Sequence, residues 1–236
     1  MLVKITDRCS MQCSHCMENA RPEGKDMSME TFVKVVDFID RNGFFFILIS
    51  GGEPTDHPLF CDFVNLAKAK LKVIVLSNGL FWRDEKRRDQ YMALDVQFQV
   101  INDSRYYPIK VDRIDHPNVL YDDKIMAPLT PIGRAKTSGF VAGRMSPLCF
   151  NLRSAVRSIR DFHDAVLFLR QKGKMCIPSI IVDGSIVAGE SQFCHKIGTV
   201  ESSNVELTNR LAQMRCNACG LADNLTPELR AMIGED

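Results

Sequence analysis

Short apolar runs alternate with longer segments of helical periodicity along the first 120 residues. The runs predict strands because they have the length of strands and are bounded by polar or glycine positions. They cover residues 2–6, 44–50, 72–77, 96–101 and 118–121. Residues 44–50 are apolar almost throughout, which is typical of a strand buried on both faces of a parallel sheet.

The segments between these runs have helical spacing. Four apolar positions after Ser28 recur at i, i+3, i+4 and i+7: Phe32, Val35, Val36 and Ile39. We expect Ser28 to cap this helix and Gly43 to end it. Asp56 is expected to cap a second helix that runs to about residue 70, and residues 84–92 predict a third, charged helix.

The second half of the chain has a different pattern. Residues 104–150 are rich in Pro, Gly and Asp and indicate no clear element. Residues 152–172 predict a helix, and residues 180–187 predict a β-hairpin whose Asp183-Gly184 pair suits a two-residue type I′ turn. A last amphipathic helix around Leu207 and Leu211 leads towards Cys216.

Strands that alternate with helices predict βαβ units and a parallel sheet. In open α/β sheets and in α/β barrels, ligands bind at the carboxyl ends of the strands. The polar motifs described below follow directly after predicted strands, so we expect them to meet at one edge of the sheet.

Composition narrows the class of protein. Hydrophobic residues make up 45% of the 236 residues and charged residues 25%, which is the balance of a globular chain rather than a disordered one. The formal net charge of +1 indicates neither a nucleic acid nor a membrane partner. No apolar run reaches the roughly 18 residues of a membrane span, and the first residues lack the apolar core of a signal peptide. We therefore expect a cytoplasmic protein.

Nine cysteines in a chain expected in a reducing compartment favour metal binding over disulfides. Cys9, Cys13 and Cys16 place three thiolates within eight residues. Three thiolates on one loop can hold three irons of a [4Fe–4S] cluster and leave the fourth iron open to a small ligand. The alternative is a structural zinc site, which usually requires four ligands and could recruit His15.

The CxxxCxxC spacing directly after a first strand resembles the signature of the radical S-adenosylmethionine (radical SAM) superfamily. In that family the residue before the third cysteine is usually aromatic, which His15 satisfies. The resemblance implies that Cys9, Cys13 and Cys16 hold the catalytic cluster.

Two further motifs support the resemblance, which covers about residues 1–100. The segment after the second strand is Gly51, Gly52, Glu53 and Pro54. It resembles the family's GGE motif, which implies that Glu53 holds the methionine amino group of S-adenosylmethionine, and the glycines would let the backbone approach that ligand. Ser77 and Asn78 resemble a TNG-like element near the same cofactor. Gln97 and Gln99 are candidates for adenine contacts, or simply polar residues of an alternating strand.

A second cysteine group lies near the end of the chain: Cys176, Cys194, Cys216 and Cys219. Taken alone, a hairpin followed by CxxC could be a zinc ribbon. After the motifs above, it resembles the SPASM/twitch region of radical enzymes such as 2-deoxy-scyllo-inosamine dehydrogenase, which implies a second [4Fe–4S] cluster. Cys149 competes with Cys176 as a ligand. A Gly133-Arg134-Ala135 segment resembles an element found ahead of such domains.

The resemblance implies an α/β fold, with a partial (β/α)6 barrel over residues 1–150 and a small twitch-like domain, a β-hairpin plus a helix, over 151–236. It implies reductive cleavage of S-adenosylmethionine to a 5′-deoxyadenosyl radical, which abstracts hydrogen from a small molecule or a peptide. A second cluster closed by four thiolates would favour net oxidation, with that cluster as electron acceptor. An external reductant such as flavodoxin or ferredoxin would be the partner.

Two alternatives remain open. One is a redox-neutral radical isomerase acting on an amino-acid-modified nucleoside in phage DNA, although the near-neutral charge gives no support to a DNA substrate. The other is a non-catalytic metal scaffold, against which the motifs after the second and third strands argue. Candidate substrate anchors are Arg134, Arg144, Asn151 and Arg153, each of which is also a plausible surface residue.

Overall fold

The computed structural model describes residues 1–125, 132–138, 159–171 and 176–213. Its strands are β1 (Leu2–Thr6), β2 (Phe46–Gly51), β3 (Lys72–Ser77), β4 (Gln97–Ile101), β5 (Val119–Asp122), β6 (Ser179–Ile180), β7 (Ser185–Val187) and β8 (Lys196–Thr199). Its helices are α1 (Met29–Arg41), α2 (Phe60–Lys68), α3 (Glu85–Met92), α4 (Arg134–Thr137), α6 (Phe162–Gln171) and α7 (Asn204–Gln213), with short 3-10 turns at η1 (Pro54–Asp56) and η2 (Leu80–Arg83).

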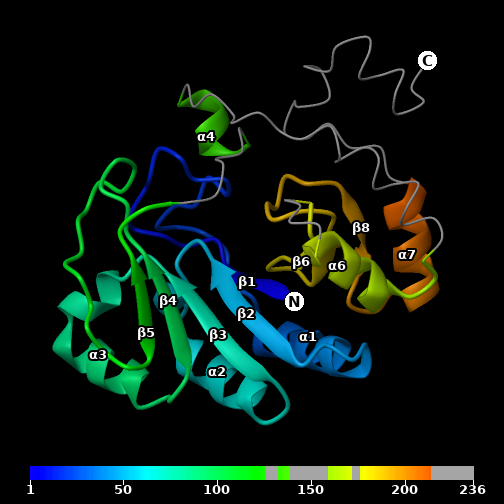
Figure 1. Ribbon diagram of the computed structural model, residues 1–236, viewed down its shortest axis with the longest axis horizontal. Coiled ribbons are helices and arrows are strands. Elements are labelled where there is room, and N and C mark those ends of the chain that lie inside the picture. The colour runs from blue at the N-terminus through cyan, green and yellow to red at the C-terminus, as the bar shows by residue number, and fades with distance from the viewer. Residues whose placement is uncertain (126–131, 139–158, 172–175, 214–236) are drawn as a thin grey trace.

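All eight strands belong to one sheet, in the order β5-β4-β3-β2-β1-β6-β7-β8. Strands β1 to β5 pair in parallel with their sequence neighbours, as the alternation of strands and helices predicted. Helices α1, α2 and α3 lie together on one side of these strands (Figure 1). The α/β fold class is therefore confirmed.

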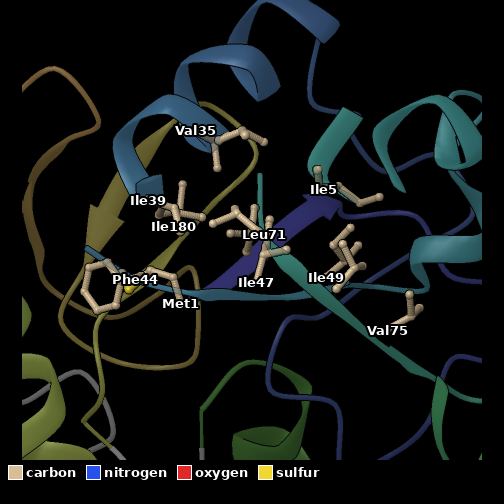
Figure 2. Packing of buried hydrophobic residues seen from close by; sticks show 14 of the residues in the cluster. Met1, Ile5, Val35, Ile39, Phe44, Ile47, Ile49, Leu71, Val75 and Ile180 are labelled. Atoms are coloured by element: carbon tan, nitrogen blue, oxygen red, sulfur yellow. The ribbon is translucent and has the colours of Figure 1, made fainter. Parts of the chain in front are cut away.

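The side chains of β1 alternate between the core and the opposite face of the sheet. Val3 and Ile5 are fully buried among the side chains that α1 and α2 contribute, whereas Leu2 and Lys4 point to the opposite face. Figure 2 shows Val35 and Ile39 of α1 packed over this layer of strand residues. The helical face of α1 that the sequence predicted is the buried face, and the Ser28 side chain accepts a hydrogen bond from the Thr31 N–H at its start.

The hairpin of the second half joins the same sheet. Strand β6 pairs in parallel with β1, through Leu2 with Ser179 and Val3 with Ile180, and β7 and β8 continue antiparallel beyond it. Helices α6 and α7 lie beside these strands, on the side of β1 away from β5 (Figure 1). The predicted domain boundary at residue 150 and the start of the predicted helix at residue 152 lie outside the described residues. The prediction of one helix over residues 152–172 is wrong at residues 159–161, which are not helical, and α6 begins at Phe162.

Two local predictions are wrong. Asp56 does not cap α2: it ends the short turn η1, and α2 begins at Phe60 after Leu59 without a side-chain cap. The hairpin turn is not a type I′ Asp-Gly turn, because only Gly184 has a positive φ, of 79°, and its N–H donates to the Ile181 carbonyl. The turn therefore spans four residues, with the glycine in its last position.

The described residues contain no helix that is both long and apolar enough to cross a membrane.

Candidate functional site

A cavity of about 280 Å³ lies at the carboxyl ends of β1 to β4. Each of these strands contributes through the segment that follows it or through its last residues. The predicted residues that line the cavity are Cys9, Cys13, His15, Cys16, Gly51, Gly52, Glu53, Ser77, Asn78, Gln99 and Arg134. The structure thus brings together strand-end motifs that lie up to 90 residues apart in the sequence, where the parallel topology predicted they would meet.

The cysteine loop after β1 presents three thiols to this cavity. Burial, together with the charge of neighbouring thiolates, raises the pKa of Cys9 to about 11 and that of Cys13 to about 12. Thiolates packed this closely need positive charge between them. Three thiolates on one loop are the ligand set of a [4Fe–4S] cluster with one open iron, whereas a structural zinc site usually has four protein ligands.

Helix α4 clamps this loop from outside. The Arg134 guanidinium donates to the backbone carbonyls of Cys13, at 3.0 Å, and of Ala20, and the Ala135 N–H donates to the Cys16 carbonyl at 3.2 Å. Gly133 has φ of 62°, and a Cβ there would lie 2.3 Å from the Met17 carbonyl oxygen. Arg134 therefore fixes the loop that carries the thiols, and its guanidinium is committed to that loop rather than to a substrate.

Glu53 is a buried carboxylate held by donors from three directions. Its oxygens accept from the Thr55 hydroxyl at 2.7 Å, the Ser77 hydroxyl at 2.8 Å and the Asn78 N–H at 2.8 Å. Burial raises the pKa of Glu53, and these donors oppose that shift. No lysine or arginine within the described part of the chain forms an ion pair with it, so an ammonium group of a ligand fits this position.

Gly51 and Gly52 are required by contact between two backbones. The Gly52 N–H donates to the Thr6 carbonyl at 2.7 Å and the Glu53 N–H to the Arg8 carbonyl at 2.6 Å. A Cβ on Gly51 would lie 2.3 Å from the Thr6 oxygen, and one on Gly52 would lie 2.1 Å from the Arg8 oxygen. The glycines thus let the Glu53 loop pack against the segment that leads into Cys9. The sequence had suggested a different role for them, close approach of the backbone to the ligand.

Asn78 links the third strand to the cysteine loop. Its side-chain amide lies 3.8 Å from the Cys9 sulfur, and its carbonyl accepts from Asn102 after β4. Asn102 is 2% exposed and also accepts from the Val111 N–H at 3.0 Å. This buried network fixes the ends of β3 and β4 against each other. Asn102 could not be predicted from the sequence, because a polar residue at a strand end is common.

His15 faces the cavity beside two tyrosines. Its ring centroid lies 5.3 Å from that of Tyr106 and 4.9 Å from that of Tyr107. Its Nδ1 atom is buried and has no hydrogen-bond partner within the described chain, and burial lowers the pKa of the ring. Buried polar atoms are usually hydrogen-bonded, so an unpartnered ring nitrogen in the cavity wall is consistent with a ligand that supplies the missing partner.

Two of the proposed cofactor residues lie outside the cavity lining. Pro54 is buried in the first turn of η1, where it shapes the loop behind Glu53. Gln97 lies at the start of β4 and donates to the Phe98 carbonyl, whereas Gln99, two residues further along the same face, lines the cavity. Of the two glutamines, Gln99 is therefore the better placed for a ligand contact.

The second cysteine group is described only in part. A Cβ on Gly189 would lie 2.7 Å from the Cys194 sulfur and 4.0 Å from the Cys176 Cα, so Cys176 and Cys194 flank one glycine. Cys149, Cys216 and Cys219 lie outside the described residues, as do the candidate anchors Arg144, Asn151 and Arg153. Cys61 lies in α2 and packs against the core, as a structural cysteine would.

Five lining residues that carry charge or a hydroxyl were not predicted from the sequence: Lys4, Glu18, Ser50, Tyr107 and Glu190. A signal existed for Lys4, since a lone charge inside the apolar first strand must face away from the core. Glu190 follows a hairpin by three residues, where polar residues are ordinary, so its sequence position indicated nothing.

Comparison with known proteins concerns the family and the fold of the chain. Residues 3–94 match the model of the Radical SAM superfamily. The chain is 36% identical over 84 residues to the antilisterial bacteriocin subtilosin biosynthesis protein AlbA of Bacillus subtilis (strain 168). The matched segment covers 35% of this chain and 19% of AlbA. It is 31% identical over 86 residues to the sporulation killing factor maturation protein SkfB of the same organism. That segment covers 36% of this chain and 21% of SkfB. The chain thus matches about a fifth of the length of these relatives.

The fold has solved neighbours. The crystal structure of BtrN in complex with AdoMet and 2-DOIA superimposes with a TM-score of 0.56 at 14% identity, over 94% of this chain and 88% of that one. An open conformation of BtrN gives a TM-score of 0.53 at 15% identity, over 95% and 90% of the two chains. At this identity the likeness concerns the fold alone. Together with the family match, it confirms the resemblance to radical SAM enzymes.

Proposed function

We propose that this chain, whose residues 3–94 are those of a radical SAM domain, reductively cleaves S-adenosylmethionine and abstracts hydrogen from a small-molecule or peptide substrate. One observation carries the proposal. Three thiols on one loop, the buried Glu53 carboxylate and the Asn78 side chain, which come from three different strand ends, line a single cavity.

The residues of the cavity have separate tasks in this reaction. Cys9, Cys13 and Cys16 would hold a [4Fe–4S] cluster, and Glu53 would bind the methionine ammonium group of S-adenosylmethionine. When bound and reduced, the cluster supplies the electron that splits the sulfonium into methionine and a 5′-deoxyadenosyl radical, which abstracts hydrogen from a C–H bond. His15 and Gln99 lie where they could meet the adenosyl portion.

The three bonds to Glu53 orient it before the ligand arrives. Because Ser77, Thr55 and the Asn78 backbone hold its oxygens, the carboxylate need not reorganise on binding. The apolar side chains of Leu2, Leu76 and Ile101 line the same cavity, and they would exclude water from a reactive radical.

The second cysteine group supports an oxidative outcome. Cys176 and Cys194, with Cys216 and Cys219, would close an auxiliary [4Fe–4S] cluster that leaves no iron for a substrate, so its natural role is to accept an electron. The names of the relatives refer to bacteriocin biosynthesis and to maturation of a killing factor, which favours a peptide among the possible substrates. Flavodoxin or ferredoxin would deliver the first electron.

Formation of 5′-deoxyadenosine tests the proposal. The full chain would be reconstituted anaerobically with iron and sulfide, reduced with dithionite and given S-adenosylmethionine, and the nucleoside would be measured by chromatography. We expect product from the wild type and from Cys61→Ala, but none above background from Cys13→Ala. A wild-type protein that is fully loaded with iron and yields no 5′-deoxyadenosine would contradict the proposal.

A further inference from the structure

A group of charged side chains lies in the cavity apart from the S-adenosylmethionine residues. Lys4 projects from β1, and its ammonium donates to the Glu18 carboxylate and to the Glu190 backbone carbonyl. Lys4 is 3% exposed and Glu18 is 7% exposed. Lys4, Glu18 and Glu190 all line the cavity, so this is a polar wall inside the site rather than a surface ion pair.

The other charged groups of the cavity already have protein partners. The second oxygen of Glu18 accepts from the Gln192 N–H at 3.0 Å. Arg134 is bound to loop carbonyls, and Glu53 is held by its three donors.

The Glu190 carboxylate is the exception. Within the described part of the chain this carboxylate accepts no hydrogen bond, although Glu190 is a residue of the cavity lining and is half-buried. Burial raises its pKa, and the charges of Lys4 and Arg170 only partly offset that effect. Lys4 is neutralised by Glu18, so the wall of three side chains has one negative charge in excess.

We propose that Glu190 is a substrate-binding carboxylate that receives a primary ammonium group. The proposal rests on the proposed function and extends it to the class of substrate: a molecule that carries an amine. An ammonium would satisfy a partly desolvated carboxylate that has no other donor, and charge-assisted hydrogen bonds are roughly twice as strong as neutral ones.

The position of Glu190 suits a substrate. It directly follows Gly189, against which Cys194 lies, and its backbone carbonyl accepts from Lys4, whose ammonium also contacts Glu18, two residues after Cys16. A molecule anchored at Glu190 would therefore lie between the cysteine loop after β1 and the segment that carries Cys194. That is where hydrogen abstraction followed by electron transfer requires the substrate.

Matched probes test the ammonium preference on the reconstituted full chain with S-adenosylmethionine present. Cyclohexylamine and cyclohexanol represent a cyclic small molecule, and acetyl-lysine amide and acetyl-norleucine amide represent a peptide side chain. Isothermal titration calorimetry would give a dissociation constant for each. We expect the amine of at least one pair to bind about tenfold more tightly than its isostere, and the pair that discriminates indicates the source of the amine.

Variants assign the preference to Glu190. Glu190→Gln should remove the preference, whereas Glu201→Gln, which changes an exposed glutamate on the surface, should keep it. Two results would overturn the proposal. One is a wild type that binds neither amine more tightly than its isostere, and the other is a Glu190→Gln protein that keeps the tenfold difference. If Glu190→Gln does not fold by circular dichroism, Glu190→Asp decides: preference retained supports the proposal, and preference lost overturns it.

The binding and cleavage tests can fail separately. Wild-type protein that forms 5′-deoxyadenosine but shows no amine preference would refute the subsite and leave the proposed function standing. Protein that prefers the amine but forms no 5′-deoxyadenosine would contradict the proposed function and leave the subsite standing.

Discussion

At the scale of single residues, the site depends on where two segments of backbone touch. Gly51 has φ of 147°, and its missing Cβ leaves room for the Thr6 carbonyl. That contact brings the Glu53 loop against the strand that leads to Cys9. The spacing of the two motifs in the sequence, about 40 residues, contains no information on this contact.

Gly51→Ala should therefore destabilise the fold more than an ordinary glycine substitution. Gly43 is a matched control, because it also has a positive φ, of 74°, but a Cβ there meets nothing within 4 Å. We expect Gly43→Ala to lower the free energy of unfolding by about 1 kcal/mol and Gly51→Ala by about 3 kcal/mol or more, since the latter adds a backbone clash to the strain. Urea unfolding measures both, and equal losses would refute the contact.

Asp103, which lies just after β4, should make stability depend on pH. Its carboxylate accepts from the Arg105 side chain and from the Ile125 N–H at 2.9 Å, and these bonds lower its pKa below the ordinary value of 3.8. Because the folded state holds the ionised form, this stabilisation is complete above about pH 4 and is lost as the pH falls towards the folded pKa. The free energy of unfolding should decline more steeply below pH 4 in the wild type than in Asp103→Asn. Parallel declines in urea titrations would show that Asp103 contributes nothing.

At the scale of elements, α4 acts on the cysteine loop through its first residues. Arg134 donates to two carbonyls of that loop, whereas Lys136 on the same helix is exposed. The loop would lose its outer support if Arg134 were shortened, and removal of such supporting bonds typically weakens metal binding by ten- to a hundredfold.

Arg134→Ala should accordingly lose iron to a chelator about tenfold faster than the wild type. Lys136→Ala serves as the control and should match the wild type. The measurement is the decay of cluster absorbance under anaerobic chelator. Equal decay in Arg134→Ala and Lys136→Ala would mean that α4 does not support the loop.

Local patterns predicted most elements and missed what depends on distant partners. The periodicity after Ser28 identified α1 and its cap, because both lie within one stretch of sequence. The Asp56 cap was wrong because the Glu53 loop continues into η1, so α2 starts four residues later. The pairing of β6 with β1 joins residues about 177 apart, and two-residue strands carry no periodicity that could indicate it.

At the scale of the whole molecule, one sheet connects the cysteine loop after β1 with the segment that carries Cys194. Glu18, two residues after Cys16, accepts from Gln192, two residues before Cys194, and the Ser191 hydroxyl donates to the Met17 carbonyl at 2.8 Å. The motifs after β1, β2 and β3 could be predicted to meet because parallel strands end at one edge. This second junction could not, since it depends on the pairing of β6 with β1.

The two cysteine groups should nevertheless bind iron independently, because the ligands proposed for the two clusters are different residues. Two [4Fe–4S] clusters correspond to about eight irons per chain, so Cys194→Ser should reduce the content of reconstituted protein to about four. The first site should stay intact, with 5′-deoxyadenosine still formed from S-adenosylmethionine, because Cys194 does not line the cavity of Cys9, Cys13 and Cys16. Cys61→Ser, in the core-facing helix α2, controls for the loss of any thiol and should keep about eight irons. Iron and sulfide assays decide the outcome: a Cys194→Ser protein with its full iron content would exclude Cys194 as a ligand.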